Sequence, residues 1–92
     1  MIDLKDILFA LSRADGVGNI REATDLAESL LSNFCKTETT DNLTVIGYLS
    51  GKRDYTLMLD AHIDQIAFVV TDVDDKGFLS LKNAGGVDLR SL

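Results

Sequence analysis

The sequence of 92 residues contains one cysteine, one histidine and no apolar run near the ~20 residues that a membrane-spanning helix requires. The single cysteine, Cys35, excludes an intramolecular disulfide framework, and we expect a buried, unreactive thiol there. The lack of a long apolar run argues against the membrane as a partner. Basic residues are also scarce, because the net charge is −6 and no basic stripe is present. Such a chain repels phosphate, so we expect no nucleic acid partner.

The remaining composition is that of a small globular domain. Hydrophobic residues make up 46% of the chain and charged residues 26%, which excludes wholesale disorder. A chain of this length buries only roughly two-thirds of the surface that its unfolded form exposes, so we expect a narrow margin of stability. The opening residues MIDLKD contain two acids where a signal peptide needs a basic start. We therefore expect a cytoplasmic protein.

Two amphipathic helices are predicted in the first third of the chain. In the first, apolar residues recur at helical spacing over residues 4–11, and Asp3 is the expected N-cap. The second spans residues 20–34. Its predicted start is a capping box, in which the Asn19 side chain accepts from the Glu22 amide and the Glu22 carboxylate reaches back to residue 19.

Five short strands separated by turn residues are predicted next, over residues 35–40, 43–50, 55–59, 66–70 and 78–82. The first two are expected to form a hairpin. The third strand ends in the apolar residues Leu57, Met58 and Leu59, which open the run LMLDAHID at residues 57–64. Such an unbroken apolar stretch is typical of a central strand covered on both faces. We expect the chemistry of the protein at the end of this buried strand.

The element order ααβββββ predicts an α/β fold with the helices ahead of the strands, as in α+β proteins, built around a mixed sheet with two helices. Two helices cover roughly one face of five strands, and a sheet needs a second layer. An exposed face or strand edge is seldom left bare in natural proteins. We therefore expect a homo-oligomer that forms through the sheet edge or the exposed sheet face.

The only histidine, His62, lies at the end of the predicted central strand, and Asp64 follows two residues later on the same side of an extended chain. Strand ends are where α/β folds open their ligand clefts. A zinc-bound imidazole commonly has its second ring nitrogen held by a carboxylate. On spacing alone, however, a lone histidine at a strand end is more often a structural residue than a metal ligand.

A longer pattern resembles the glutamyl or deblocking aminopeptidases, a family of tetrahedral metallopeptidases some of whose members carry the names endoglucanase or cellulase. It comprises residues 57–70 (LMLDAHIDQIAFVV), 74–79 (DDKGFL) and 85–92 (GGVDLRSL), and it extends to residues 16–19 (GVGN) and 41–43 (DNL). The likeness covers essentially the whole chain. The shared order is a His-x-Asp strand, an aspartate-glycine turn, an aromatic-led strand and Gly-Gly-x-Asp.

The resemblance implies the fold and the chemistry of a zinc peptidase. Residues 1–82 would be the N-terminal segment of a phosphorylase/hydrolase-like catalytic domain, and residues 83–92 would begin a β-rich insertion or dimerisation domain. In the complete family, two divalent metals, zinc or cobalt, serve the hydrolysis of N-terminal residues from peptide substrates. The resemblance assigns His62 to a metal and makes Asp64 the catalytic-site carboxylate that supports this histidine.

The resemblance also implies that most of the site is missing. The family's other metal ligands and its general-base glutamate follow the β-rich insertion, beyond Leu92. Three positions depart from the family pattern, namely Gln65, Ala67 and Val87 where glutamate, glycine and tryptophan are usual. None changes His62 or Asp64, but Gln65 removes a charge beside the site.

Two functions stay open at this point. The chain is either the leading portion of a metallo-aminopeptidase, inactive alone, or a non-catalytic module that assembles into oligomers. Whether it is itself an enzyme is left open, because one imidazole cannot assemble a two-metal site. Peptide specificity and metal identity are not encoded in the residues present.

Overall fold

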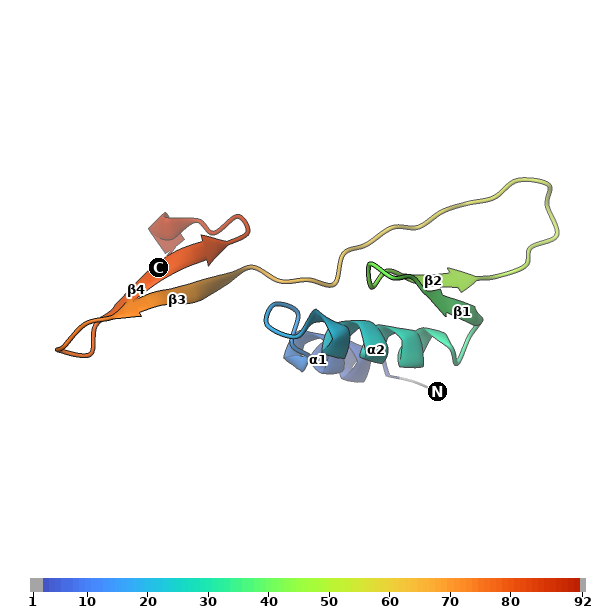
Figure 1. The fold of residues 1–92 in the computed structure, drawn as a ribbon. Coiled ribbons are helices and arrows are strands. Elements are labelled where there is room, and N and C mark those ends of the chain that lie inside the picture. Colours follow the sequence, from blue (N-terminus) through green and yellow to red (C-terminus); the bar gives the residue numbers. More distant parts are fainter. Residues whose placement is uncertain (1–2, 92) are drawn as a thin grey trace.

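The computed structural model describes residues 3–91. Two helices, α1 (Leu4–Arg13) and α2 (Ile20–Leu31), precede four strands and a 3₁₀ helix at Leu89–Ser91. The strands are β1 (Lys36–Thr39), β2 (Val45–Tyr48), β3 (Ala67–Val73) and β4 (Leu79–Ala84). The predicted order of helices followed by strands is confirmed, and the chain is an α+β structure (Figure 1). None of the helices in residues 3–91 has the length and apolarity to cross a membrane.

Helix α1 begins as the sequence predicts, because the Asp3 side chain accepts a hydrogen bond from the Lys5 amide at 2.9 Å. The predicted capping box at the start of α2 is wrong, since the Asn19 side chain makes no capping hydrogen bond. The Asp15 carboxylate accepts from the Asn19 amide at 2.7 Å. The Asp15 carboxylate thus accepts the hydrogen bond of the Asn19 amide that the Glu22 carboxylate was expected to accept.

Helix α2 packs on the first hairpin and forms the small core of the described residues. Strands β1 and β2 form the predicted first hairpin, and they pair antiparallel in the register Lys36↔Tyr48 to Thr39↔Val45. Thr24 of α2 is fully buried, and its hydroxyl donates to the carbonyl of Ile20 or of Leu43, both within 3.3 Å. The hairpin is therefore fixed to the helix by a polar contact as well as by apolar packing.

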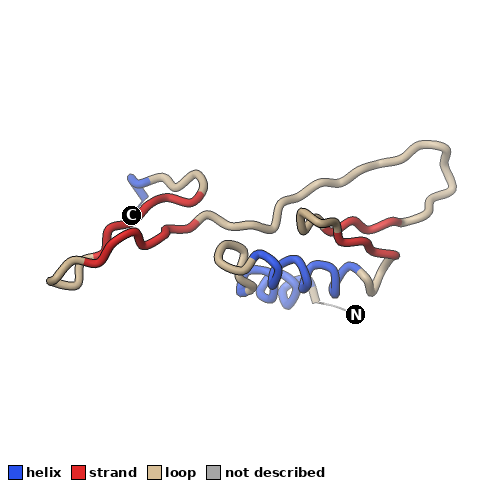
Figure 2. Tube along the Cα trace, viewed as in Figure 1, coloured by secondary structure: helices blue, strands red, loops and turns tan. Residues whose placement is uncertain are grey.

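The second hairpin, β3 with β4, projects away from the helices (Figure 2). The four described strands form two separate two-stranded antiparallel sheets, so the expected single mixed sheet is not observed. The radius of gyration is 17.8 Å, whereas a compact domain of this length has about 12 Å. The described chain is elongated, with extents of 63 × 28 × 27 Å.

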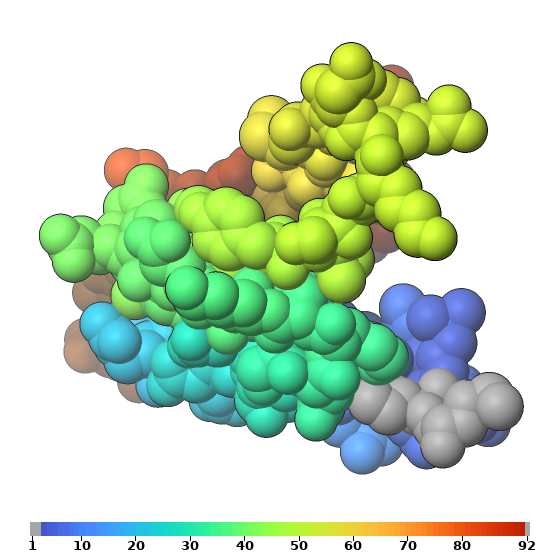
Figure 3. All heavy atoms as spheres, turned by 90° about the vertical axis from the view of Figure 1, so that its right-hand side faces the viewer, coloured from blue at the N-terminus to red at the C-terminus, as the bar shows by residue number. Residues whose placement is uncertain are grey.

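The predicted buried strand at residues 55–59 is wrong, and so is the central position given to residues 57–64. This segment is extended but not assigned to a strand, and no backbone–backbone hydrogen bond in the described chain involves residues 51–64. Leu57, Met58 and Leu59 are 75%, 82% and 87% exposed. The physical reason is that a strand requires a partner edge, and none of the described strands pairs with this segment. Figure 3 shows the chain after β2 standing out from the body.

Candidate metal-binding site

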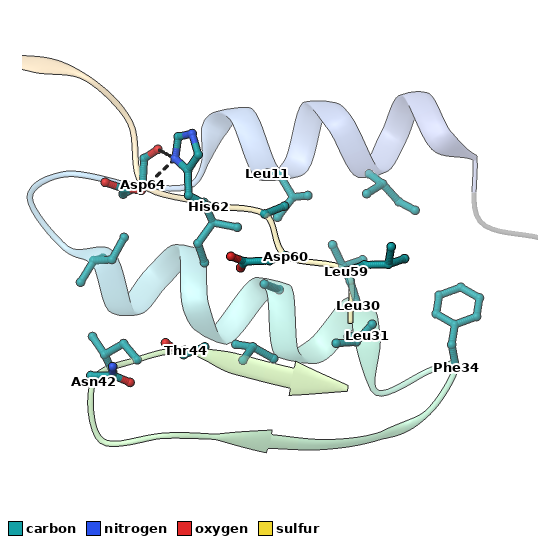
Figure 4. A pocket seen from close by; sticks show the side chains of 17 residues that line it. Leu11, Leu30, Leu31, Phe34, Asn42, Thr44, Leu59, Asp60, His62 and Asp64 are labelled. Atoms are coloured by element: carbon teal, nitrogen blue, oxygen red, sulfur yellow. Dashed lines mark hydrogen bonds and ion pairs between the residues drawn. The ribbon is translucent and has the colours of Figure 1, made fainter. Parts of the chain in front are cut away.

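His62 and Asp64, which the sequence places two residues apart, lie in contact on the extended segment that leads into β3 (Figure 4). The Nδ1 atom of His62 lies 2.9 Å from the Asp64 carboxylate oxygen Oδ1 and 3.0 Å from the Asp64 carbonyl oxygen. Both neighbours of Nδ1 accept hydrogen bonds, so Nδ1 carries the hydrogen. In the neutral ring, the lone pair available to a metal is then on Nε2.

The pair lies on the surface of the described chain, since the two side chains are 85% and 69% exposed. The hydrogen bond that His62 donates to the Asp64 carboxylate raises the pKa of His62, and its contact with the Asp64 carbonyl and the negative charge of the carboxylate act in the same direction. A metal must displace the proton from Nε2 of a protonated ring. The raised pKa therefore extends the protonated form of this ring, which cannot ligate a metal through Nε2, to higher pH.

Replacement of Asp64 by asparagine is expected to lower the pKa of His62 toward the usual value of about 6.5, because the charged acceptor is lost. The measurement is an NMR titration of the imidazole resonances, which is unambiguous because the chain has one histidine. Asp60→Asn is the matched control, since it removes a nearby carboxylate that makes no hydrogen bond to His62, and should leave the titration almost unchanged. Equal titration curves for the wild type and Asp64→Asn would contradict the assigned contact.

The turn between α1 and α2 fixes the backbone just after His62. The Gln65 amide donates to the Gly16 carbonyl at 3.1 Å, and the Gln65 side-chain amide donates to the Ser12 carbonyl at 3.5 Å. A Cβ on Gly16 would lie 3.0 Å from the carbonyl oxygen of Ile63, so a larger residue would strain this approach. The sequence drew attention to Gln65 only as a lost charge, whereas the structure shows it anchoring the site segment.

The turn itself is organised by Asp15, whose role the sequence did not reveal. Its carboxylate accepts from the amides of Val17, Gly18 and Asn19 at 2.9, 2.7 and 2.7 Å. These hydrogen bonds, led by that from Val17, favour the charged form and lower the pKa of Asp15. The signal in the sequence was an aspartate followed by glycine, a pair that favours such local turns.

A groove of about 760 Å³ lies beside the pair. Its floor is formed by apolar side chains of α1 and α2, one wall by residues 42–45 at the start of β2, and the other by residues 59–64. Figure 4 shows Asp60 on this second wall, apart from the contact between His62 and Asp64. The groove thus separates the candidate site from the first hairpin.

The residues of the described chain do not form a complete metal site. Within residues 3–91 no group of three or more histidine, cysteine, aspartate or glutamate side chains is placed to hold a metal ion. A catalytic zinc ion usually has three protein ligands. The donors here fit one ligand, the Nε2 atom of His62, with Asp64 in the supporting position.

Comparison with known proteins gives a consistent result. The model of the family described as M42 glutamyl aminopeptidase matches residues 44–92, which is more than half of the chain. A protein of Acetivibrio thermocellus named "Putative aminopeptidase" is 32% identical over 91 residues, covering 92% of this chain and 26% of that protein. The chain thus spans about a quarter of the length of this relative. No solved structure matches the chain significantly.

Proposed function

Because the chain belongs to the M42 glutamyl aminopeptidase family, we propose that it is part of a two-metal aminopeptidase that removes N-terminal residues from peptides. In this proposal His62 is a ligand of one metal, and Asp64 orients the ring and fixes its tautomer. The observation that supports it is the contact of Nδ1 with the Asp64 carboxylate, which leaves Nε2 for a metal. Cytoplasmic peptides are the proposed substrates.

The proposal assigns the rest of the site to residues that this chain does not supply. The described residues offer one imidazole ligand and no cluster that holds a metal. We assign residues 1–82 to the catalytic domain and residues 83–92 to the start of its β-rich insertion. The metals are zinc or cobalt ions that bind once the remaining ligands are present.

The isolated chain is therefore expected to release no amino acid from N-terminal peptide anilides, with either zinc or cobalt added. Activity should appear when the part of the Acetivibrio thermocellus relative that this chain does not match is supplied as a separate polypeptide. Release of the anilide chromophore measures both reactions. Hydrolysis by the purified chain alone that disappears in the His62→Ala variant would contradict the assignment of an incomplete site.

A second candidate function is a non-catalytic module that forms homo-oligomers. The observation that favours it is the second hairpin, where Val69, Val73 and Phe78 are 50%, 58% and 70% exposed. Apolar surface of this kind commonly marks an interface. Sedimentation tests this candidate, because a stable monomer at micromolar concentration is incompatible with it.

A further inference from the structure

The segment between β2 and β3, which carries His62 and Asp64, is joined to the rest of the described chain by few hydrogen bonds (Figure 2). One backbone–backbone hydrogen bond of this segment reaches another element, and it runs from the Gln65 amide to the Gly16 carbonyl at 3.1 Å. The side-chain hydrogen bond that leaves the segment is also made by Gln65, to the Ser12 carbonyl at 3.5 Å. In the described chain, Gln65 thus supplies the hydrogen bonds that hold the candidate site against the helices.

Apolar packing of this segment begins at the same place. Residues 47–62 are all exposed, so burial does little to fix them. Ile63 is half-buried and lines the groove together with residues of α1 and α2. The position of the His62 ring relative to the helices is therefore set by residues 63–65, which follow it directly in the chain.

The contact of these residues with the turn between α1 and α2 requires glycine at position 16. A Cβ on Gly16 would lie 3.0 Å from the carbonyl oxygen of Ile63, 3.2 Å from Cγ of Gln65 and 3.4 Å from the Gln65 amide nitrogen. The first two distances are shorter than an ordinary van der Waals contact. Because the nearest atom belongs to the backbone, it cannot move aside by a side-chain rotation. Alanine at position 16 would therefore displace residues 63–65.

The Gly16 carbonyl is itself held by the turn around it. The Asp15 carboxylate accepts hydrogen bonds from the amides of Val17, Gly18 and Asn19. Hydrogen bonds to an ionised acceptor are stronger than neutral ones. The turn is also tightly packed, since a Cβ on Gly18 would lie 3.0 Å from Oδ2 of Asp15. The acceptor that receives the Gln65 amide is thus part of a well-fixed turn.

We propose that Gln65 and Gly16 are positioning residues of the metal site, which hold the His62 ring at the place where the metal binds. This inference rests on the proposed function, because it assigns these residues a role toward the metal that His62 would bind. A ligand must be held within roughly 0.5 Å of its working geometry. An exposed, unpaired segment cannot do so by itself, and the contact between Gln65 and Gly16 supplies the missing restraint.

The side chain of Gln65 adds a second restraint that depends on its carboxamide. Ser12 lies in the last turn of α1, where helix carbonyls have no intrahelical partner. The Gln65 carboxamide donates to this carbonyl, whereas an ionised carboxylate has no hydrogen to donate. A negative charge is also unfavourable at the C-terminus of a helix. Gln65→Glu, which changes the size of the side chain little, should therefore release this contact.

The first test follows the 92-residue chain without metal by NMR. In Gly16→Ala, the Gln65 amide is expected to exchange with solvent at least about tenfold faster than in the wild type, because its hydrogen bond is disrupted. The backbone order parameters of residues 60–64 should fall at the same time. Gly51→Ala is the matched control, because an added Cβ there meets nothing within 4 Å. It should leave both quantities unchanged, and circular dichroism verifies that each variant is folded.

The second test uses the complex of this chain with the complementing polypeptide, loaded with cobalt. In Gly16→Ala, the affinity for one cobalt ion is expected to fall about tenfold, the lower end of the range for groups that orient a metal ligand. The visible absorption of bound cobalt should change as well, since it reports the geometry of the ligands. Gln65→Glu should shift both in the same direction but less, because its backbone hydrogen bond remains. A purely structural role would lower stability but leave the spectrum of the fully loaded complex unchanged.

The proposal is overturned if the Gln65 amide of Gly16→Ala exchanges as slowly as in the wild type. It is also overturned if the cobalt affinity and spectrum of the Gly16→Ala complex match those of the Gly51→Ala complex. If Gly16→Ala does not fold, Gln65→Glu decides, and a wild-type cobalt affinity and spectrum in that variant reject the role. In each of these cases a wild-type complex that hydrolyses peptide anilides leaves the proposed function standing. A wild-type complex that binds no metal rejects the proposed function, and the positioning role with it.

Discussion

On the proposed function, replacing His62 by alanine is expected to reduce kcat/KM for anilide hydrolysis by the complex of this chain with the complementing polypeptide by more than about 100-fold. Loss of a residue that hydrogen-bonds a metal ligand typically costs about 10- to 100-fold in affinity or activity, and loss of the ligand itself should cost more. Asp64→Asn is the graded comparison, because it keeps the imidazole and removes only its charged partner, and a loss of about 10- to 100-fold is expected. Anilide hydrolysis under subsaturating substrate gives both values.

The structure indicates that the His62→Ala variant should fold normally, so a loss of activity can be assigned to the site. His62 is largely exposed, and both of its hydrogen bonds are to Asp64. His62→Ala should therefore associate with the complementing polypeptide as the wild type does. Asp60→Asn, which alters a carboxylate on the groove wall, should retain most of the activity. Retention of activity by His62→Ala within about tenfold would show that this residue is not a ligand.

Substitution of Gly47 by valine is expected to destabilise the fold by roughly 1–3 kcal/mol, the usual cost of overpacking a core. A Cβ at this position would lie 2.6 Å from Cδ2 of Leu31 and 2.7 Å from Sγ of Cys35. Valine favours strands intrinsically. Strand propensity alone would therefore predict that Gly47→Val stabilises the fold. Urea unfolding followed by circular dichroism measures the change.

The matched control for Gly47→Val is Gly51→Val, where an added Cβ meets nothing within 4 Å. Its free energy of unfolding should stay within about 0.5 kcal/mol of the wild type, as is usual for surface substitutions. Since the fully buried residues of the described chain are few, a loss at Gly47 represents a large part of its stability. Equal stability of the two variants would contradict the packing of α2 on the first hairpin.

The features that the sequence predicted correctly are those set by local interactions. The two helices follow from the 3.6-residue recurrence of apolar side chains. The first hairpin and the strands near β3 and β4 follow from turn residues between short β-type runs. The contact between His62 and Asp64 was likewise foreseeable, because residues two apart share one side of an extended chain. Resemblance to the glutamyl aminopeptidases was also correct, and the family match confirms it.

The features that the sequence missed depend on distant partners. Residues 57–59 were predicted to be buried from their apolarity, but burial requires neighbouring strands that the described chain does not place beside them. The capping box failed because the Asp15 carboxylate, four residues before Asn19, accepts from its amide. The anchoring of Gln65 on Gly16 involves two backbone groups, and side-chain patterns carry no information about such a contact.

The most direct test of the central claim is the zinc content of the reconstituted complex, measured by elemental analysis after gel filtration. If His62 is a metal ligand completed by residues elsewhere, the wild-type complex should hold two zinc ions per complex. The His62→Ala complex should then lose one of them, while the Asp60→Asn complex retains both. Equal zinc content in the wild-type and His62→Ala complexes would contradict the assignment of His62 to the metal site.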